Sequence, residues 1–174
     1  MKRILIILGI IAAVLLVGIL VIRTVTKSSS PEAVAQIDQN GLTVKVDYCQ
    51  PSKKGREIFG DLVPYGQVWR TGANEATVIT FNQDVTVAGQ PLKAGEYTLW
   101  TIPSQQGWIA IINRETGQWG TNYDQSKDLF RAPIVSRPHS PMAEQFTISF
   151  APATSGADMI LAWDQTEAVV PIRR

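Results

Sequence analysis

The sequence has little cysteine, little histidine and almost no excess of charge. Cys49 is the only cysteine and His139 the only histidine among 174 residues. One cysteine excludes an internal disulfide, and one residue of each kind cannot form a zinc tetrad or a three-ligand zinc site without several carboxylates. We therefore expect no metal site and no cofactor.

The charge balance excludes another class of partner. The full chain has a formal net charge of +1. Four of its basic residues, Lys2, Arg3, Arg23 and Lys27, flank an apolar run, and the rest of the chain carries about −3 without them. Phosphate backbones are bound by clusters of lysine and arginine, and no such stripe is visible. Nucleic acid is not an expected partner.

The same scarcity limits nucleophilic catalysis. A serine or cysteine nucleophile normally needs a histidine within hydrogen-bonding reach. His139 lies between Pro138 and Pro141, where the prolines predict a surface turn. Cys49 is expected to act as a small apolar side chain. The sequence therefore assigns no catalytic residue.

An uncharged apolar run covers residues 4–22. Its length is close to the roughly 20 residues that a helix needs to cross a bilayer. We predict a transmembrane anchor in residues 1–23, with the lipid bilayer as the partner of residues 4–22. A cleaved secretory signal is the alternative, because small residues at positions 33–35 resemble a cleavage site, but its apolar stretch is usually only about 7–15 residues long.

The flanking side chains do not determine the orientation of the anchor, because two basic residues stand on each side of the run. The additional N-terminal amine and the long downstream segment favour a cytoplasmic N-terminus and an extracytoplasmic C-terminal domain. Residues 24–35 are serine-rich and polar, which is typical of a flexible linker. Residues 36–174 have the length of one domain with its own core.

Strand patterns dominate the domain. Residues 42–49 alternate between apolar and polar side chains, which places Leu42, Val44, Val46 and Tyr48 on one buried face. Residues 108–112 are apolar throughout, as in a strand covered on both sides. Further strands are predicted at residues 76–81, 84–87, 96–102, 130–135, 146–150, 159–163 and 168–172. Without a helical period, this pattern predicts an all-β, two-sheet antiparallel sandwich, for which a jelly roll is one arrangement.

One segment, residues 54–77, interrupts the strand rhythm with glycines, aromatics and charges. Long loops of this kind are commonly functional or act as structural lids. The block 55–77, the Gly-Glu-Tyr and Thr-Ile-Pro motifs within residues 94–103, Trp119-Gly120, and Tyr123 with Asp128 and Arg131 resemble the domain-of-unknown-function 2911 family of bacteria. The resemblance implies an all-β domain of the cell envelope with a secretory N-terminus, and it implies no reaction.

Aromatic and charged residues in the loops favour a binding role. Trp100, Trp108 and Trp163 lie in predicted strands and are expected in the core, whereas Trp69 and Trp119 stand next to loop glycines or charges. Indole faces beside charged and amide groups are suited to sugar recognition. The candidate ligand-binding residues are Arg56, Trp69, Arg70, Asn74, Glu75, Trp119, Asp128 and Arg131.

Three functions remain open on this basis. The first is a non-catalytic binding module for a carbohydrate or an envelope component. The second is a structural or protein-interaction domain in which Arg70–Glu75 and Arg131–Asp128 pairs hold the loop as an internal lid. The third is a hydrolase that uses Glu75 or Asp61 as its acid or base, although paired carboxylates need a separation that a sequence does not supply.

Overall fold

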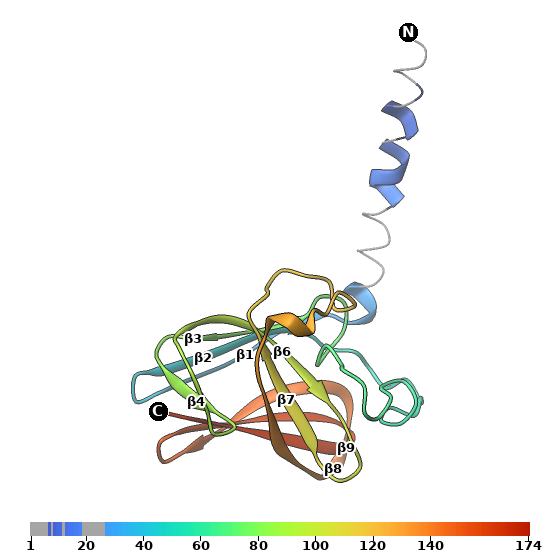
Figure 1. The fold of residues 1–174 in the computed structure, drawn as a ribbon. Helices are drawn as coiled ribbons and strands as arrows, with labels where there is room; N and C mark the ends of the chain where they lie inside the picture. Colours follow the sequence, from blue (N-terminus) through green and yellow to red (C-terminus); the bar gives the residue numbers. More distant parts are fainter. Residues whose placement is uncertain (1–6, 8, 12, 19–26) are drawn as a thin grey trace.

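A computed structural model describes residues 7, 9–11, 13–18 and 27–174 (Figure 1). The predicted anchor at residues 1–23 and the first residues of the predicted linker therefore lie partly outside the described residues. Residues 7, 9–11 and 13–18 have helical backbone. Within the described part of the chain, no helix combines the length and the apolar character that crossing a membrane requires.

The described domain is built almost entirely from β-strands, as the sequence predicts. All pairings between its strands are antiparallel, in the order β1-β2-β3-β6-β7-β8-β9-β4-β5. The elements are β1 (Glu32–Gln39), β2 (Leu42–Cys49), β3 (Thr77–Phe81), β4 (Val85–Val87), β5 (Gln90–Leu92), β6 (Gly95–Ile102), β7 (Trp108–Asn113), the 3-10 turn η1 (Gln125–Lys127), β8 (Asp128–Ala153) and β9 (Gly156–Arg173).

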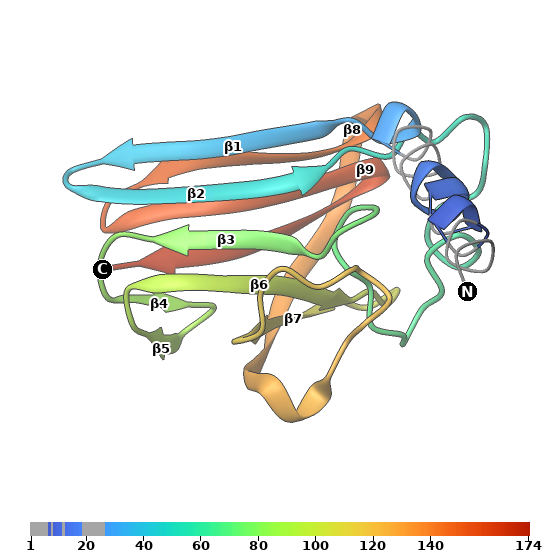
Figure 2. The same ribbon diagram turned by 90° about the horizontal axis from the view of Figure 1, so that it is seen from above.

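The long strand β8 joins two layers of the domain. Its first part pairs with β7 as far as Ile134, and from Val135 onward it pairs with β9. Figures 1 and 2 show that β1, β2, β3 and β6 lie over the second half of β8 and β9. The core therefore lies between two layers, and the strands of both layers are linked by one continuous series of hydrogen-bonded pairs.

Alternation in β2 determines which side chains enter this core. Leu42, Val44, Val46 and Tyr48 are all buried, in agreement with the predicted face. Tyr48 also accepts a hydrogen bond across the core, since the N–H of Ile148 and its hydroxyl oxygen are 3.0 Å apart. In that bond the backbone N–H is the donor and the hydroxyl accepts, which fixes the opposite layer against β2.

Five aromatic side chains form the centre of the core at one end of the domain. Trp69 stacks on Trp163 with ring centroids 5.9 Å apart and lies edge-on to Phe146 at 5.0 Å. Phe59 and Trp108 complete the group, 4.9 Å apart. Edge-to-face and stacked pairs contribute about 0.5–1.5 kcal/mol each beyond area burial. Trp100, Trp108 and Trp163 are buried, as predicted.

The structure extends several of the predicted strands. β1 begins at Glu32 and so includes the end of the segment expected to be a linker. The strands predicted at residues 130–135 and 146–150 are parts of the single strand β8. Prolines suggested a break between them, but the register with β9 shifts after Pro138 and again after Ala143. Such irregularities accommodate proline within a strand.

His139 is consequently part of β8, and the expectation of a surface turn there was wrong. Its Nδ1 lies 2.7 Å from Oε2 of Glu167, and Nε of Arg137 donates to Oε1 of the same carboxylate at 2.5 Å. Glu167 is only 9% exposed. Burial alone would raise the pKa of Glu167, but the hydrogen bonds from Arg137 and His139 outweigh it and hold the pKa below its ordinary value of 4.5.

This lowered pKa predicts a pH-dependent contribution to stability. A carboxyl group with a depressed pKa in the folded state stabilises the fold fully above its unfolded pKa, and the contribution is lost as pH falls through the folded value. Glu167→Gln should therefore lower the melting temperature at pH 7, and the difference from the wild type should shrink at pH 3. Equal differences at both pH values would contradict this account. Thermal denaturation followed by circular dichroism measures both.

Candidate functional site

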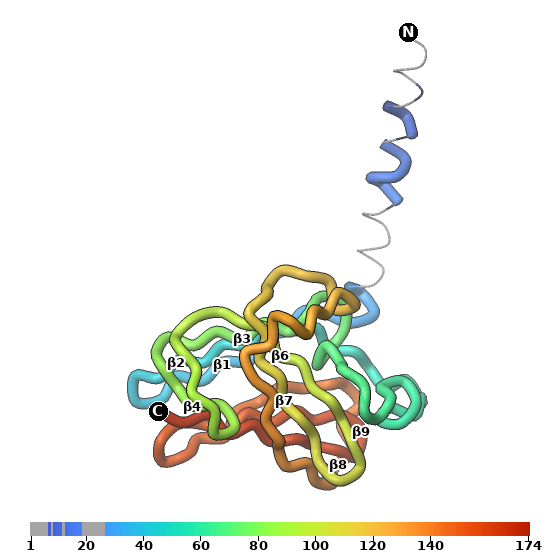
Figure 3. The backbone as a smooth tube through the Cα atoms, in the orientation of Figure 1, coloured from blue at the N-terminus to red at the C-terminus, as the bar shows by residue number. Residues whose placement is uncertain are grey.

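The loop at residues 50–76 covers one end of the domain (Figure 3). Buried Ile58 and Val63 anchor its first half, where the N–H of Val63 donates to the carbonyl of Ile58 at 2.8 Å. Its second half is attached to β6, because Trp69 and Thr101 exchange two backbone hydrogen bonds of 2.7 and 2.9 Å. The loop is thus held in place by backbone bonds and by core side chains.

Trp69 belongs to the core, and it offers no flat face to solvent. It is 9% exposed, and its indole N–H donates to the carbonyl of Gly72 at 3.1 Å. Sequence reasoning weighed a surface platform against burial beneath the loop at this position, and the structure shows burial. The next residue along the chain, Arg70, has a half-buried side chain.

A tight turn follows Arg70. Thr71 and Asn74 both have left-handed backbone angles, with φ of 54° and 60°. The Thr77 hydroxyl donates to the carbonyl of Thr71 at 2.7 Å and closes this turn. Asn74 is buried, and its amide nitrogen lies 3.5 Å from the carbonyl oxygen of Ser30. Left-handed angles are strained for residues with a Cβ, so the turn depends on these surrounding bonds.

On one side of this turn lies a hollow of about 410 Å³, here called the cationic pocket. Three of its lining residues, Lys54, Arg56 and Arg70, are basic, and none is acidic. Trp69 and Trp163 provide apolar wall. The remaining lining residues are Ser29, Ser30, Pro51, Leu62, Val63, Gly72 and Ala73.

Arg70 is the unusual member of the cationic pocket. Burial lowers the pKa of its guanidinium, and among the described residues no carboxylate lies within ion-pairing distance of it. The guanidinium of Arg56 donates to the backbone carbonyls of Ser52 and Lys53. A partly buried cation without a counter-charge is energetically unfavourable. The pocket therefore offers uncompensated positive charge to an anion.

Trp119 and Gly120 support Arg70 from the adjacent loop. Trp119 forms an isolated antiparallel bridge with Glu75, and the N–H of Gly120 donates to the carbonyl of Asn74 at 2.9 Å. A Cβ added at Gly120 would lie 2.6 Å from that carbonyl oxygen and closer still to Cδ of Arg70. Glycine at this position therefore allows the arginine stem to cross the loop.

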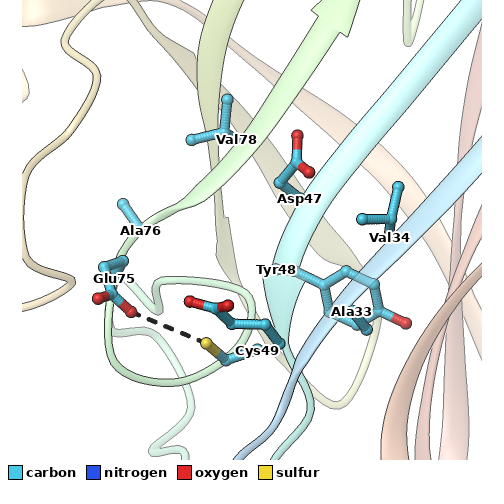
Figure 4. A pocket seen from close by; sticks show the side chains of 9 residues that line it. Ala33, Val34, Asp47, Tyr48, Cys49, Glu75, Ala76 and Val78 are labelled. Carbon is cyan, nitrogen blue, oxygen red and sulfur yellow. Dashed lines mark hydrogen bonds between the residues drawn. The ribbon is translucent and has the colours of Figure 1, made fainter. Parts of the chain in front are cut away.

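On the other side of the turn lies a hollow of about 490 Å³, here called the acidic pocket (Figure 4). Its charged lining residues are Glu32, Asp47 and Glu75. The thiol of Cys49 lies 3.8 Å from Oε2 of Glu75, and burial raises the pKa of this thiol, with the carboxylates acting in the same direction. Raised pKa values keep thiols protonated and weakly nucleophilic. Cys49 is buried, as expected for a structural cysteine.

Glu75 has a different partner from the one that the lid hypothesis requires. Its Oε1 lies 3.7 Å from Nζ of Lys27, which also pairs with Glu32. No ion pair between Arg70 and Glu75 is present in the described part of the chain. Arg70 lines the cationic pocket and Glu75 lines the acidic one, and the tight turn lies between them in the sequence.

Asp128 and Arg131 form a separate polar cluster with Tyr123. Nε of Arg131 donates to Oδ2 of Asp128 at 2.9 Å, and the Tyr123 hydroxyl donates to the same oxygen at 2.6 Å. Asn113 donates to the other carboxylate oxygen at 2.9 Å. Burial, together with the hydrogen bond to Asp128, raises the pKa of Tyr123 to about 12. The predicted Asp128–Arg131 pair is confirmed, and it lines neither pocket.

The predicted site residues are thus divided among three places. Arg56, Trp69 and Arg70 line the cationic pocket, and Glu75 lines the acidic one. Asp61 is exposed and lines neither of them. Sequence reasoning missed Lys54, Trp163 and Ser30 as pocket residues. Lys54 was within the long loop and could have been included, whereas Trp163 and Ser30 come from distant segments that only folding brings to the loop.

No group of three or more histidine, cysteine, aspartate or glutamate side chains is arranged to hold a metal ion within residues 27–174 or the described helical residues before them. The acidic pocket has three carboxylates, and two of them, those of Glu32 and Glu75, are paired with Lys27. The chemistry that the geometry supports is therefore anion recognition in the cationic pocket.

The contact between Gly120 and Arg70 gives a direct test of this geometry. Gly120→Ala should destabilise the fold by about 1–3 kcal/mol, because the added methyl group overpacks the Asn74 carbonyl and the Arg70 stem. Thr121→Ala is the control, since its side chain is exposed and bonds to the neighbouring exposed Asn122, and its effect should stay within about 0.5 kcal/mol. Urea denaturation measures both. Equal effects would contradict the close packing described for Gly120.

Comparison with known proteins supports the resemblance seen in the sequence. No curated protein and no solved structure matches the chain. One family model, described as "Protein of unknown function (DUF2911)", matches residues 30–172. That range includes the acidic pocket, the cationic pocket except for Ser29, the tight turn and every strand of the domain except for the final residue of β9. Since the match extends over most of its length, the chain belongs to the DUF2911 family of proteins of unknown function.

Proposed function

We propose that this protein is a non-catalytic binding module whose cationic pocket takes an anionic carbohydrate or another anionic component of the cell envelope. The observation that carries the proposal is Arg70. Its guanidinium is partly buried, lines a pocket of about 410 Å³ and has no carboxylate partner among the described residues. A bound carboxylate or phosphate would supply the missing counter-charge.

The energetics favour an anion over a neutral ligand. Hydrogen bonds that involve a charged group contribute about 1.5–3 kcal/mol, roughly twice the value for neutral pairs. Arginine also presents several N–H donors in a plane, which suits carboxylate and phosphate oxygens. Arg56 lines the same pocket, so a second guanidinium is available to a ligand anion.

The apolar wall suits the rest of such a ligand. Trp69 and Trp163 both line the pocket beside the basic residues. Small-molecule sites typically measure about 300–1,000 Å³ and combine apolar walls with a few convergent polar groups. The cationic pocket has this composition, and its volume of about 410 Å³ falls within this range.

The remaining parts of the proposal concern the whole chain. We propose that residues 4–22 form a single membrane-spanning anchor with a cytoplasmic N-terminus, and that the domain is a periplasmic, extracytoplasmic β-sandwich. Support for the anchor comes from its described side chains, since Ile10, Val14 and Leu15 are 59–65% exposed. Apolar side chains exposed to this extent favour an environment other than water. Support for a sandwich comes from the two layers joined by β8 (Figure 2).

The structural or protein-interaction role is the alternative. The aromatic core favours it, because Trp69 of the loop is buried there and holds the loop against the domain. It makes an opposite prediction for Arg70. If Arg70 held the loop through a buried ion pair, its removal would cost about 3–5 kcal/mol. Without such a partner, its removal costs little. The hydrolase hypothesis has weaker support, because Glu75 lines the acidic pocket and Asp61 lines neither of the two pockets.

The binding proposal predicts that anions stabilise the full-length protein in a neutral detergent. Glucuronate and inorganic phosphate should raise its melting temperature and change the fluorescence of the pocket tryptophans, whereas glucose should have a smaller effect. Ligand at about 100 times its Kd stabilises by about 2.7 kcal/mol. Arg70→Gln should abolish the response while the melting temperature without ligand stays near that of the wild type.

Arg174→Gln is the matched control. Arg174 is exposed and donates to a backbone carbonyl, that of Asn40, and the C-terminus lies at the end of the domain opposite the loop (Figures 1 and 2). This variant removes the same charge and should respond to anions like the wild type. If Arg70→Gln kept the full response, or if it unfolded by several kcal/mol while Arg174→Gln did not, the binding site would be wrong.

A further inference from the structure

The position of the cationic pocket relative to the N-terminal segment is informative. Ser29 and Ser30 form part of the pocket wall. The apolar run ends at Ile22, seven residues before Ser29, and a fully extended chain covers at most about 25 Å over that distance. If residues 4–22 occupy the bilayer, the pocket wall therefore lies close to the headgroup layer.

The N-terminal segment and the C-terminus lie at different ends of the domain. Figures 1 and 2 both place the N-terminal segment and the loop at residues 50–76 at one end of the domain, and the C-terminus at the other. The loop end is therefore the one next to the apolar run. Its neighbouring residues Ser30 and Pro31 are fixed to the domain, since the N–H of Gln50 donates to the carbonyl of Pro31 at 2.8 Å.

Three basic side chains of the loop at residues 50–76 line the cationic pocket. The domain as a whole is acidic, so general attraction to an anionic surface is not expected from its net charge. Lys54, Arg56 and Arg70 nevertheless line one hollow without a carboxylate among its lining residues. Glu57 and Asp61 are exposed on the same loop but do not line that hollow. A local basic site of this kind suits one phosphate group better than a broad polyanion.

Apolar side chains accompany these charges. Leu62 lines the cationic pocket and is 43% exposed, and Tyr65 on the same loop is 39% exposed. Tyrosine and leucine beside lysine and arginine are the combination found where proteins contact the interface between headgroups and acyl chains. This loop therefore presents both the charge that a phosphate needs and the apolar contacts that a lipid surface provides.

We infer that the cationic pocket takes the phosphate of an anionic phospholipid headgroup, with the tip of the loop facing the membrane in which the chain is anchored. This inference rests on the proposed anion-binding function and names its ligand class. A lipid phosphate and a soluble phosphate share the chemistry that Arg70 recognises. The membrane-proximal position of the pocket and the exposed Leu62 and Tyr65 favour the lipid.

Hydrogen exchange of the full-length protein in nanodiscs tests this inference. Nanodiscs of phosphatidylcholine alone are compared with nanodiscs that also contain phosphatidylglycerol. Backbone amides in residues 51–73 should exchange more slowly with phosphatidylglycerol, and added salt should reduce the difference. Arg56→Gln, which removes one exposed cation, should reduce the protection roughly fivefold. Arg70→Gln should remove it, and Arg174→Gln should leave it unchanged.

A third arm adds inorganic phosphate to the phosphatidylcholine nanodiscs and separates the two proposals. If soluble phosphate protects residues 51–73 and phosphatidylglycerol does not, the lipid inference is overturned and the proposed anion-binding function stands. If neither protects them, both are overturned. Protection by phosphatidylglycerol that persists in both Arg56→Gln and Arg70→Gln also overturns the inference, because the contact then lies outside the pocket.

Discussion

The packing of Trp69 against Trp163 and Phe146 is the constraint on which the candidate site depends. This side chain fastens the long loop to the core, and its backbone pairs with Thr101 at the end of β6. Because neighbouring residues in an extended chain point to opposite sides, burial of Trp69 directs Arg70 away from the core. The charge of the cationic pocket is therefore positioned by an apolar contact one residue away.

The tight turn after Arg70 then separates charges of opposite sign. Arg70 remains with the cationic pocket, whereas Glu75 lies in the acidic pocket beside Lys27 and Cys49. A sequence in which an arginine and a glutamate are five residues apart suggests an ion pair, yet the left-handed angles at Thr71 and Asn74 reverse the chain between them. The result is a cation that has no carboxylate partner among the residues that the structure describes, which is the basis of the binding proposal.

Much of the fold could be predicted from sequence because alternation in strands such as β2 reports directly on burial. The early start of β1 was missed because its residues follow a serine-rich stretch and include several exposed polar side chains. β8 was divided in two because its prolines look like breaks, and only the register shifts explain how they fit. The candidate site could be predicted in part. Arg56, Trp69 and Arg70 lie in one distinctive loop, but the contribution of Ser30 and Trp163 depends on long-range contacts that no local pattern reveals.

The attachment of Ser30 and Pro31 also has a mechanical meaning. These residues come between the apolar run and the first strand, and they are bonded to Asn74 and Gln50 respectively. Tension along the N-terminal chain would reach Lys27, which pairs with Glu32 and Glu75 in the acidic pocket, and then Ser29 and Ser30 in the wall of the cationic pocket. A pull or a tilt between the domain and whatever holds the N-terminus would therefore act on the walls of both pockets.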